Sequence, residues 1–300
     1  MRLLILGAGY SGKAIARECG PDFASAHGTT RSADTFGEIR HAGAEPLVFD
    51  GSEITPALAE ALREATHLVQ SISPAKEGDG FLRLVDDLAS VAPNLRWIGY
   101  LSTIGVYGNR NGAWVDEDAD LEPVNERSRE RVAAERNWRA RGAGMDIPVA
   151  VLRLSGIYGP GRNAFVNLAN GTARRLIKPG QIFNRIRVED IGRFCRFLIG
   201  RDVGGVYNVT DAEPGPPQDV IEYAARLMGV PVPPDIPFET AELSPMARSF
   251  YGESKRVSNA RARALGFDFL YPDYRVSLEQ MWNDQSWRSV QGQIPARPKA

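Results

Sequence analysis

Residues 3–12 read LLILGAGYSG, and this stretch decides the fold. Its four leading apolar residues indicate a buried strand, and helix-compatible residues follow its last glycine. A strand, a glycine turn and a helix come in this order in folds that bind dinucleotides. Because the first N–H groups of a helix are free and carry partial positive charge, the turn predicts a binding site for a cofactor diphosphate.

Each glycine of the turn has its own expected role. Gly7 makes the tight turn, Gly9 lets the backbone approach the phosphates, and Gly12 lets the helix pack close to the strand. Tyr10 and Ser11 lie between these glycines and are expected to contact the cofactor with them. The alternative is an ordinary strand-to-helix turn that happens to contain three glycines.

The composition is that of a globular protein with a substantial core. With 300 residues, 43% of them hydrophobic, the chain suits one large domain or a large domain with a smaller companion. Its net charge of -1 gives no field that attracts nucleic acid or an anionic membrane surface. No apolar run reaches the length of a membrane span, and the apolar start is too short for a signal peptide. We therefore expect a cytoplasmic protein that acts on a small molecule.

Cysteine and histidine are too sparse to predict a structural or metal site. Cys19 and Cys195 are the only cysteines, which argues against a disulfide framework and a thiolate zinc site. The three histidines all fall in the first quarter of the chain, and their spacing predicts no metal site. We expect no metal, and the sequence does not predict an oligomeric state.

Strand-like and helical segments alternate through the first half of the chain, which predicts an α/β protein with a Rossmann-type, doubly wound parallel sheet. Strands are expected at 3–6, 23–27, 46–49, 67–71, 96–101 and 149–154. Helices are expected at 11–19, 35–42, 56–64, 81–91 and 123–141. By the carboxyl-end rule, the ligand then binds at the loops that follow the strands.

The rhythm changes after residue 154, and prolines cluster beyond residue 210. We expect residues 1–175 to form the dinucleotide-binding domain, with residues 185–210 returning to complete its sheet. Residues 176–300 are expected to form a smaller, C-terminal substrate-binding domain. The tail from 291 to 300 is expected to be disordered.

The end of the second strand usually distinguishes NADP from NAD. No carboxylate occurs there before Asp34, and Arg31 offers a planar fork that matches phosphate oxygens. NADP is therefore favoured, with NAD as the alternative, and Arg31 could instead be a solvated residue that opens the next helix. The serines Ser71 and Ser73 at the end of the fourth strand are expected to line the cofactor.

Asp50 closes the third strand and admits two interpretations. Its carboxylate could accept a hydrogen bond from the adenine amino group of the cofactor. It could also cap the helix that begins near Pro56.

Several segments together resemble the short-chain dehydrogenase/reductase superfamily, in particular its extended and atypical branch, the NAD-dependent epimerase/dehydratase family. The resemblance spans residues 1 to about 210, with weaker similarity at 255–259 and 265–266. It is carried by the glycine loop, Asp50 and the segments 101–108 (LSTIGVYG), 153–161 (RLSGIYGPG), 187–191 (RVEDI) and 207–210 (YNVT). The glycine loop departs from the usual family pattern, which has one more residue between its first two glycines.

The family resemblance implies a catalytic Ser or Thr and a Tyr four residues before a Lys. Thr103 matches the hydroxyl position and is expected to orient the substrate oxygen. Arg127 and Arg131 stand at the positions where the family has this Tyr and Lys. No Tyr occurs between Tyr107 and Tyr158. The usual acid/base pair is therefore absent. Tyr107 is the better candidate for a replacement proton donor, with Tyr158 as the other.

Arginine cannot replace the tyrosine as a proton donor, because it stays protonated. It can stabilise a developing alkoxide or bind an anion. Arg127 is therefore expected to stabilise charge, and Arg131, one turn later on the same helix face, is expected to contact an anionic substrate with it. The alternative is a solvated face of an arginine-rich helix. Arg185 and Tyr158 are further candidates for substrate contacts.

These features predict an NADP-dependent oxidoreductase or epimerase/dehydratase-like enzyme for a small, anionic or hydroxyl-bearing metabolite. The alternative is a non-catalytic sensor or regulatory protein that binds NADP(H), which the missing Tyr-Lys pair favours. A nucleotide-sugar epimerase with full family chemistry ranks third, because that chemistry normally uses the missing tyrosine.

Overall fold

The structure, a computed structural model, describes residues 1–288, and the predicted disordered tail at 291–300 lies outside them. At its centre is a parallel sheet of seven strands in the order β11-β7-β5-β4-β1-β2-β3, as counted within the described residues. The strands are β1 (Arg2–Leu6), β2 (Ser25–Thr30), β3 (Glu45–Val48), β4 (His67–Gln70), β5 (Trp97–Thr103), β7 (Val149–Leu154) and β11 (Gly205–Val209).

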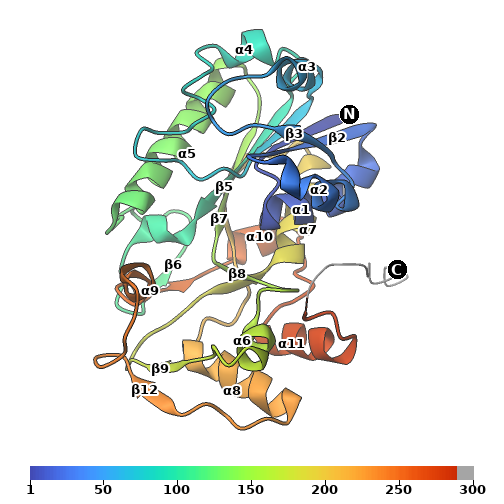
Figure 1. Ribbon diagram of the computed structural model, residues 1–300. Helices are drawn as coiled ribbons and strands as arrows, with labels where there is room; N and C mark the ends of the chain where they lie inside the picture. The colour runs from blue at the N-terminus through green and yellow to red at the C-terminus, as the bar shows by residue number, and fades with distance from the viewer. Residues whose placement is uncertain (289–300) are drawn as a thin grey trace.

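Helices cover both faces of this sheet (Figure 1). One face carries α1 (Tyr10–Cys19), α2 (Phe36–His41) and α7 (Val188–Ile199), and the other carries α3 (Pro56–Glu64), α4 (Leu88–Val91) and α5 (Glu126–Gly144). Strand β1 supplies both cores, because Leu3 and Ile5 pack on the first face while Leu4 and Leu6 pack on the second. Burial on both faces explains its unbroken apolar run. The predicted Rossmann-type α/β fold is confirmed.

Most of the remaining elements form a smaller part of the molecule below the sheet (Figure 1), whereas the helix at Ala260–Ala264 packs against the central sheet through the buried Ala262. A separate apolar cluster joins α6, α8 and α11 there. The elements are β6 (Trp114–Val115), β8 (Gly156–Tyr158), α6 (Ala164–Ala169), β9 (Arg175–Ile177), β10 (Arg185–Arg187), α8 (Pro217–Met228), β12 (Asp235–Pro237), α9 (Pro245–Phe250), β13 (Arg256–Val257), α10 (Ala260–Ala264) and α11 (Tyr274–Asn283). Short 3-10 turns lie at η1 (Gly20–Asp22), η2 (Ala33–Thr35) and η3 (Ile104–Tyr107). The exact division of the chain into domains stays a prediction.

Two expected elements differ from the structure. Strand β2 ends at Thr30, three residues later than expected. The expected helix at 81–91 is wrong except for its last turn, α4. The buried carboxylate of Asp79 accepts hydrogen bonds from the amides of Phe81 and Leu82, and this fixes a compact loop in place of a helix. Among the described residues, no helix is both long and apolar enough to cross a membrane.

Candidate functional site

The turn between β1 and α1 requires glycine at two positions for reasons internal to the fold. Gly7 has a φ of +90°, which favours glycine, and its N–H donates to the Thr29 hydroxyl at 2.8 Å. A Cβ on Gly12 would lie 2.4 Å from the carbonyl oxygen of Gly7, so only glycine lets α1 approach the turn this closely. These contacts fit the roles expected for both residues in the sequence.

Gly9 differs, because no part of the protein requires a glycine there. A Cβ at this position would meet no heavy atom within 4 Å, so the space in front of it is open. Gly9 is also the N-cap of α1, and no side chain caps this helix end or places an acid in its first turn. An uncapped helix start leaves N–H donors without a partner in the helix, and they attract anions.

Tyr10 and Ser11 follow in the first turn of α1. The Tyr10 hydroxyl donates to the carbonyl oxygen of Pro160 at 3.0 Å, and the Arg162 guanidinium lies over its ring. Burial raises the pKa of Tyr10. Ser11 is buried. Tyr10 thus joins the glycine turn to the segment that follows β8.

Arg31 and Asp50 lie where β2 and β3 end. Arg31 is exposed, and no hydrogen bond or ion pair with another described residue holds its side chain. Asp50 accepts hydrogen bonds from the amide and hydroxyl of Ser52, which lower its pKa. Thr55 caps α3 through a hydrogen bond from the Leu58 amide, so the interpretation of Asp50 as the helix cap is wrong.

Arg131 reaches from α5 to the carboxyl ends of β4 and β5. Its guanidinium donates to the hydroxyl of Ser73 at 2.7 Å and to the carbonyl oxygen of Leu101 at 2.6 Å. Ser71 is fixed at the same edge, because its amide donates to the carbonyl oxygen of Leu6. The structure thus places Arg131 in contact with Ser73, and Ser71 beside the end of β1. Both terminal nitrogens of Arg131 are bonded within the protein, so the expected substrate contact through Arg131 is not supported.

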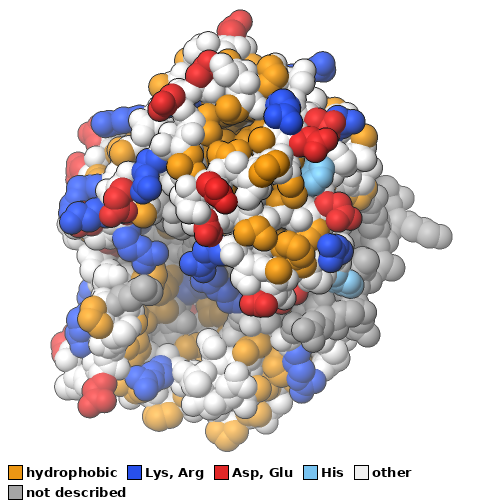
Figure 2. Space-filling view, turned by 45° about the horizontal axis from the view of Figure 1, so that its top comes forward, with side chains coloured by type: hydrophobic (Ala, Val, Ile, Leu, Met, Phe, Trp, Pro, Cys, Tyr) orange, Lys and Arg blue, Asp and Glu red, His pale blue; other side chains and the backbone are white. Residues whose placement is uncertain are grey.

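Arg127 lies one turn before Arg131 on the same face of α5. It is exposed, and no other described residue pairs with its guanidinium. Asn125, the N-cap of α5, donates to the carboxylate of Glu253 at 3.4 Å, so the start of the helix contacts the smaller part of the molecule. Along the chain, Arg127 therefore lies between Asn125, which contacts Glu253, and Arg131, which contacts Ser73. Figure 2 shows the surface hollowed between the two parts, with Lys and Arg side chains on its walls.

Thr103 ends β5 and caps η3, where its hydroxyl accepts a hydrogen bond from the Gly105 amide at 3.1 Å. Its side chain lies near α5, because a Cβ on Gly105 would lie 2.9 Å from the hydroxyl oxygen of Ser128 and 3.4 Å from that of Thr103. No described residue accepts a hydrogen bond from the Thr103 hydroxyl, so its proton can be donated to a ligand. Thr103 and Arg127 thus come from neighbouring elements at the carboxyl end of the sheet.

Tyr107 does not fit the role of proton donor. It is fully buried, and its hydroxyl donates to the Asn208 side chain at 2.7 Å and accepts from Arg153 at 2.9 Å. Burial raises its pKa to about 12. Since both partners are internal, the hydroxyl holds η3 to β7 and β11 and is not available to a substrate.

A buried ion pair that the sequence did not reveal extends this network. Arg153 pairs with Glu135 at 2.9 Å, and both side chains are 5% exposed. Glu135 also accepts a hydrogen bond from the hydroxyl of Ser102, next to Thr103. A glutamate at a core-facing position of α5, one helical turn after Arg131, was the available signal.

Tyr158 and Arg185 also do not lie with Thr103 and Arg127. Tyr158 packs against the apolar cluster of α6, α8 and α11. The Arg185 guanidinium donates to the carbonyl oxygens of Phe183, Gly215 and Pro216 and lies over the ring of Tyr274. Its donors hold backbone of the smaller part, so the expected substrate contact through Arg185 is not supported.

Lys255 is a buried lysine that joins two distant segments of the chain. Its ammonium donates to the carbonyl oxygen of Gly108 at 2.7 Å and pairs with Glu253. Burial lowers its pKa. With the contact between Glu253 and Asn125, this pair fastens the segment before β13 to the ends of η3 and α5.

Comparisons with known proteins address the fold. A conserved protein of unknown function from Silicibacter pomeroyi is 47% identical, with a TM-score of 0.85 over 95% of this chain and 99% of that one. A putative NAD-dependent epimerase/dehydratase from Methylobacillus flagellatus is 25% identical, with a TM-score of 0.71 over 95% and 98% of the two chains. The chain has the epimerase/dehydratase family fold. The resemblance read from the sequence is confirmed.

Further matches include one curated protein and two solved structures with the same fold. Protein YeeZ from Escherichia coli K12 is 27% identical over 91% of this chain and 97% of its own length. UDP-glucuronic acid 4-epimerase from Bacillus cereus, solved with NAD, and human epimerase family protein SDR39U1, solved with NADPH, share the fold at 16% identity. Their TM-scores are 0.72 and 0.71, over 97% and 95% of this chain and 99% and 100% of theirs. No family model matches the chain.

Proposed function

We propose that this protein is an NADP-dependent oxidoreductase or epimerase/dehydratase-like enzyme that acts on a small metabolite. The observation that carries the proposal is the uncapped start of α1, with open space in front of Gly9. A backbone that is closely packed at Gly7 and Gly12 but open at Gly9 suits a bound diphosphate. Family-fold neighbours that hold NAD or NADPH support the same assignment.

Arg31 supports NADP as the preferred cofactor. It follows β2, where a 2′-phosphate lies in dinucleotide folds, and its guanidinium has no internal partner among the described residues. Arginine binds phosphate through two parallel hydrogen bonds. Asp50 retains its proposed role near the adenine, because its helix-capping alternative is excluded.

The chemistry of the site rests on Thr103 and Arg127. NADPH, when bound, supplies a hydride for a substrate carbonyl carbon. The Thr103 hydroxyl donates a hydrogen bond to the carbonyl oxygen, and Arg127 stabilises the negative charge that develops there. Neither side chain gives up a proton in this arrangement, so water protonates the resulting alkoxide.

The first test is binding and turnover on the full chain. We expect calorimetry to show one NADPH per chain, and absorbance at 340 nm to show NADPH oxidation with at least one carbonyl compound from a panel of carboxylated, phosphorylated and neutral metabolites. Replacing Arg31 by Ala should weaken NADPH about 10–100-fold, because about 1.5–3 kcal/mol of charged hydrogen bonding is lost, and should leave NADH binding unchanged. No binding of either reduced cofactor would exclude the proposal.

The second candidate is a sensor that binds NADP(H) without turnover. Two observations favour it: the Tyr107 hydroxyl is hydrogen-bonded within the protein, and arginines stand where the family has its catalytic Tyr and Lys. Stoichiometric NADPH binding with no oxidation across the whole panel, at several pH values, would select this function over the enzyme.

A further inference from the structure

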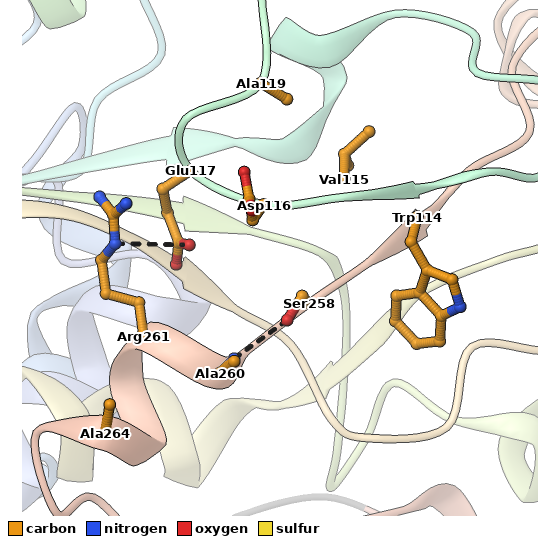
Figure 3. A pocket seen from close by; sticks show the side chains of 9 residues that line it. All are labelled: Trp114, Val115, Asp116, Glu117, Ala119, Ser258, Ala260, Arg261 and Ala264. Atoms are coloured by element: carbon orange, nitrogen blue, oxygen red, sulfur yellow. Dashed lines mark hydrogen bonds and ion pairs between the residues drawn. The ribbon is translucent and has the colours of Figure 1, made fainter.

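A pocket of about 630 Å³ lies at the edge of the central sheet, away from the β1–α1 turn. Its walls come from β6 and the residues that follow it on one side, and from α10 on the other (Figure 3). It lies beside β11, whose Asn208 contacts the pocket residue Glu117, whereas β1 is four strands further into the sheet. Its volume is in the range of small-molecule sites, about 300–1,000 Å³.

Glu117 places a buried carboxylate at this pocket. Its side chain is only 2% exposed, and one carboxylate oxygen accepts a hydrogen bond from the Asn208 amide at 2.7 Å. The other oxygen receives no hydrogen bond from the described residues, and its nearest cation, the Nε of Arg261, is 3.7 Å away. Arg261 instead donates to Asp118 at 2.6 Å. Because no described residue donates a hydrogen bond to this second oxygen, it can accept one from a ligand in the pocket.

Trp114 gives the pocket a flat apolar wall. It is 59% exposed, although large aromatic side chains usually bury most of their surface. Figure 3 shows Trp114 at one end of the pocket and Glu117 with Arg261 at the other, with Ser258 between them. The remaining wall is made of small side chains, including Ala119, which leave the space between these ends free.

The charges at this pocket favour a cation. Asp116 and Glu117 line it and Asp118 adjoins it, against the single positive charge of Arg261. An exposed indole face also attracts cations. We propose that the pocket binds a small organic cation with a flat apolar body, whose N–H group donates to the free oxygen of Glu117 while its body packs against Trp114. This site is separate from the proposed cofactor site and does not depend on it.

The test uses three probes of one shape and different charge: benzamidinium, benzamide and benzoate. Each is titrated calorimetrically into the full chain without cofactor. We expect saturable, one-to-one binding of benzamidinium only. Replacing Glu117 by Gln keeps an oxygen for the Asn208 amide but removes the charge, and should weaken benzamidinium at least about tenfold, as expected for a lost charge-assisted hydrogen bond.

Two further variants separate binding from folding. Trp114→Ala changes an exposed side chain, so the fold should persist while benzamidinium binding weakens severalfold. Glu45→Gln, on β3 at the opposite edge of the sheet, is the matched control and should bind normally. Binding of benzoate or benzamide as strong as that of benzamidinium would overturn the proposal, as would absence of benzamidinium binding. Wild-type affinity in the Trp114→Ala variant would do the same, even if Glu117→Gln fails to fold.

Discussion

The β1–α1 turn and the β5–α5 end face the same edge of the sheet but are built in opposite ways. At the β1–α1 turn, the backbone is left open, with an uncapped helix and free space in front of Gly9. At the β5–α5 end, polar side chains are paired with one another, including Tyr107 with Asn208 and Arg153 with Glu135. One region keeps donors for a ligand, whereas the other uses most of its polar groups to stabilise the fold.

This difference separates binding from chemistry. A cofactor diphosphate needs backbone amides and room, and both are present at Gly9. General acid catalysis needs a titratable side chain within reach of the substrate. Near Thr103, the groups that sequence motifs nominate are either internally bonded or permanently charged. The proposed cofactor binding and the proposed chemistry therefore rest on separate regions, and a reaction at Thr103 would need a proton source other than the tyrosine of the usual pair.

The largest effect is expected from Arg153→Met. The substitution leaves the Glu135 carboxylate buried, with the Ser102 hydroxyl as its remaining partner, and should lower the free energy of unfolding by about 3–5 kcal/mol. Urea denaturation measures it. The matched control is Arg129→Met, because Arg129 lies exposed on α5 and should stay within about 0.5 kcal/mol of wild type. Equal stability of the two variants would show that the pair does not hold the β5–α5 end together.

Gly9→Val tests the open region. The fold should persist, because the added side chain meets no protein atom within 4 Å of its Cβ. NADPH binding should fall at least about 100-fold, or about 2.7 kcal/mol, because the side chain occupies the space of the diphosphate. Calorimetry measures the affinity, and circular dichroism checks the fold. Gly37→Val is the control, since Gly37 also faces open space but lies in α2. A variant that binds NADPH normally would move the diphosphate away from Gly9.

The sequence was most informative where structure depends on neighbours in the chain. The strand, the glycine turn and the first helix all lie within residues 2–19, and all three were predicted. The partners of Tyr107 could not be predicted, because Asn208 lies 101 residues away and Arg153 lies 46 residues away. The helix expected at 81–91 was wrong for another reason. Buried apolar residues recur there at helical spacing, but the chain forms a loop fixed by Asp79 until α4 begins.

Arg127→Ala tests an exposed cation at the start of α5 whose guanidinium has no partner among the described residues. Its loss should leave NADPH affinity nearly unchanged and lower kcat/KM for a carbonyl substrate about 10–100-fold, because charge on the substrate oxygen is less stabilised. Steady-state assays that follow NADPH absorbance at 340 nm measure kcat/KM. Arg136→Ala, further along α5 and exposed, is the control. Unchanged kcat/KM would remove Arg127 from the mechanism.

Tyr107→Phe should have the smallest effect, and its smallness is informative. The variant loses a hydrogen bond to Asn208 and one from Arg153, so the free energy of unfolding should fall by about 1 kcal/mol. Cofactor affinity and turnover should match wild type, because the hydroxyl contacts only protein groups. A proton donor would behave in the opposite way, with stability little changed and turnover reduced about 10²–10⁴-fold. Comparing the change in unfolding free energy with the change in turnover therefore decides whether Tyr107 donates a proton or only stabilises the fold.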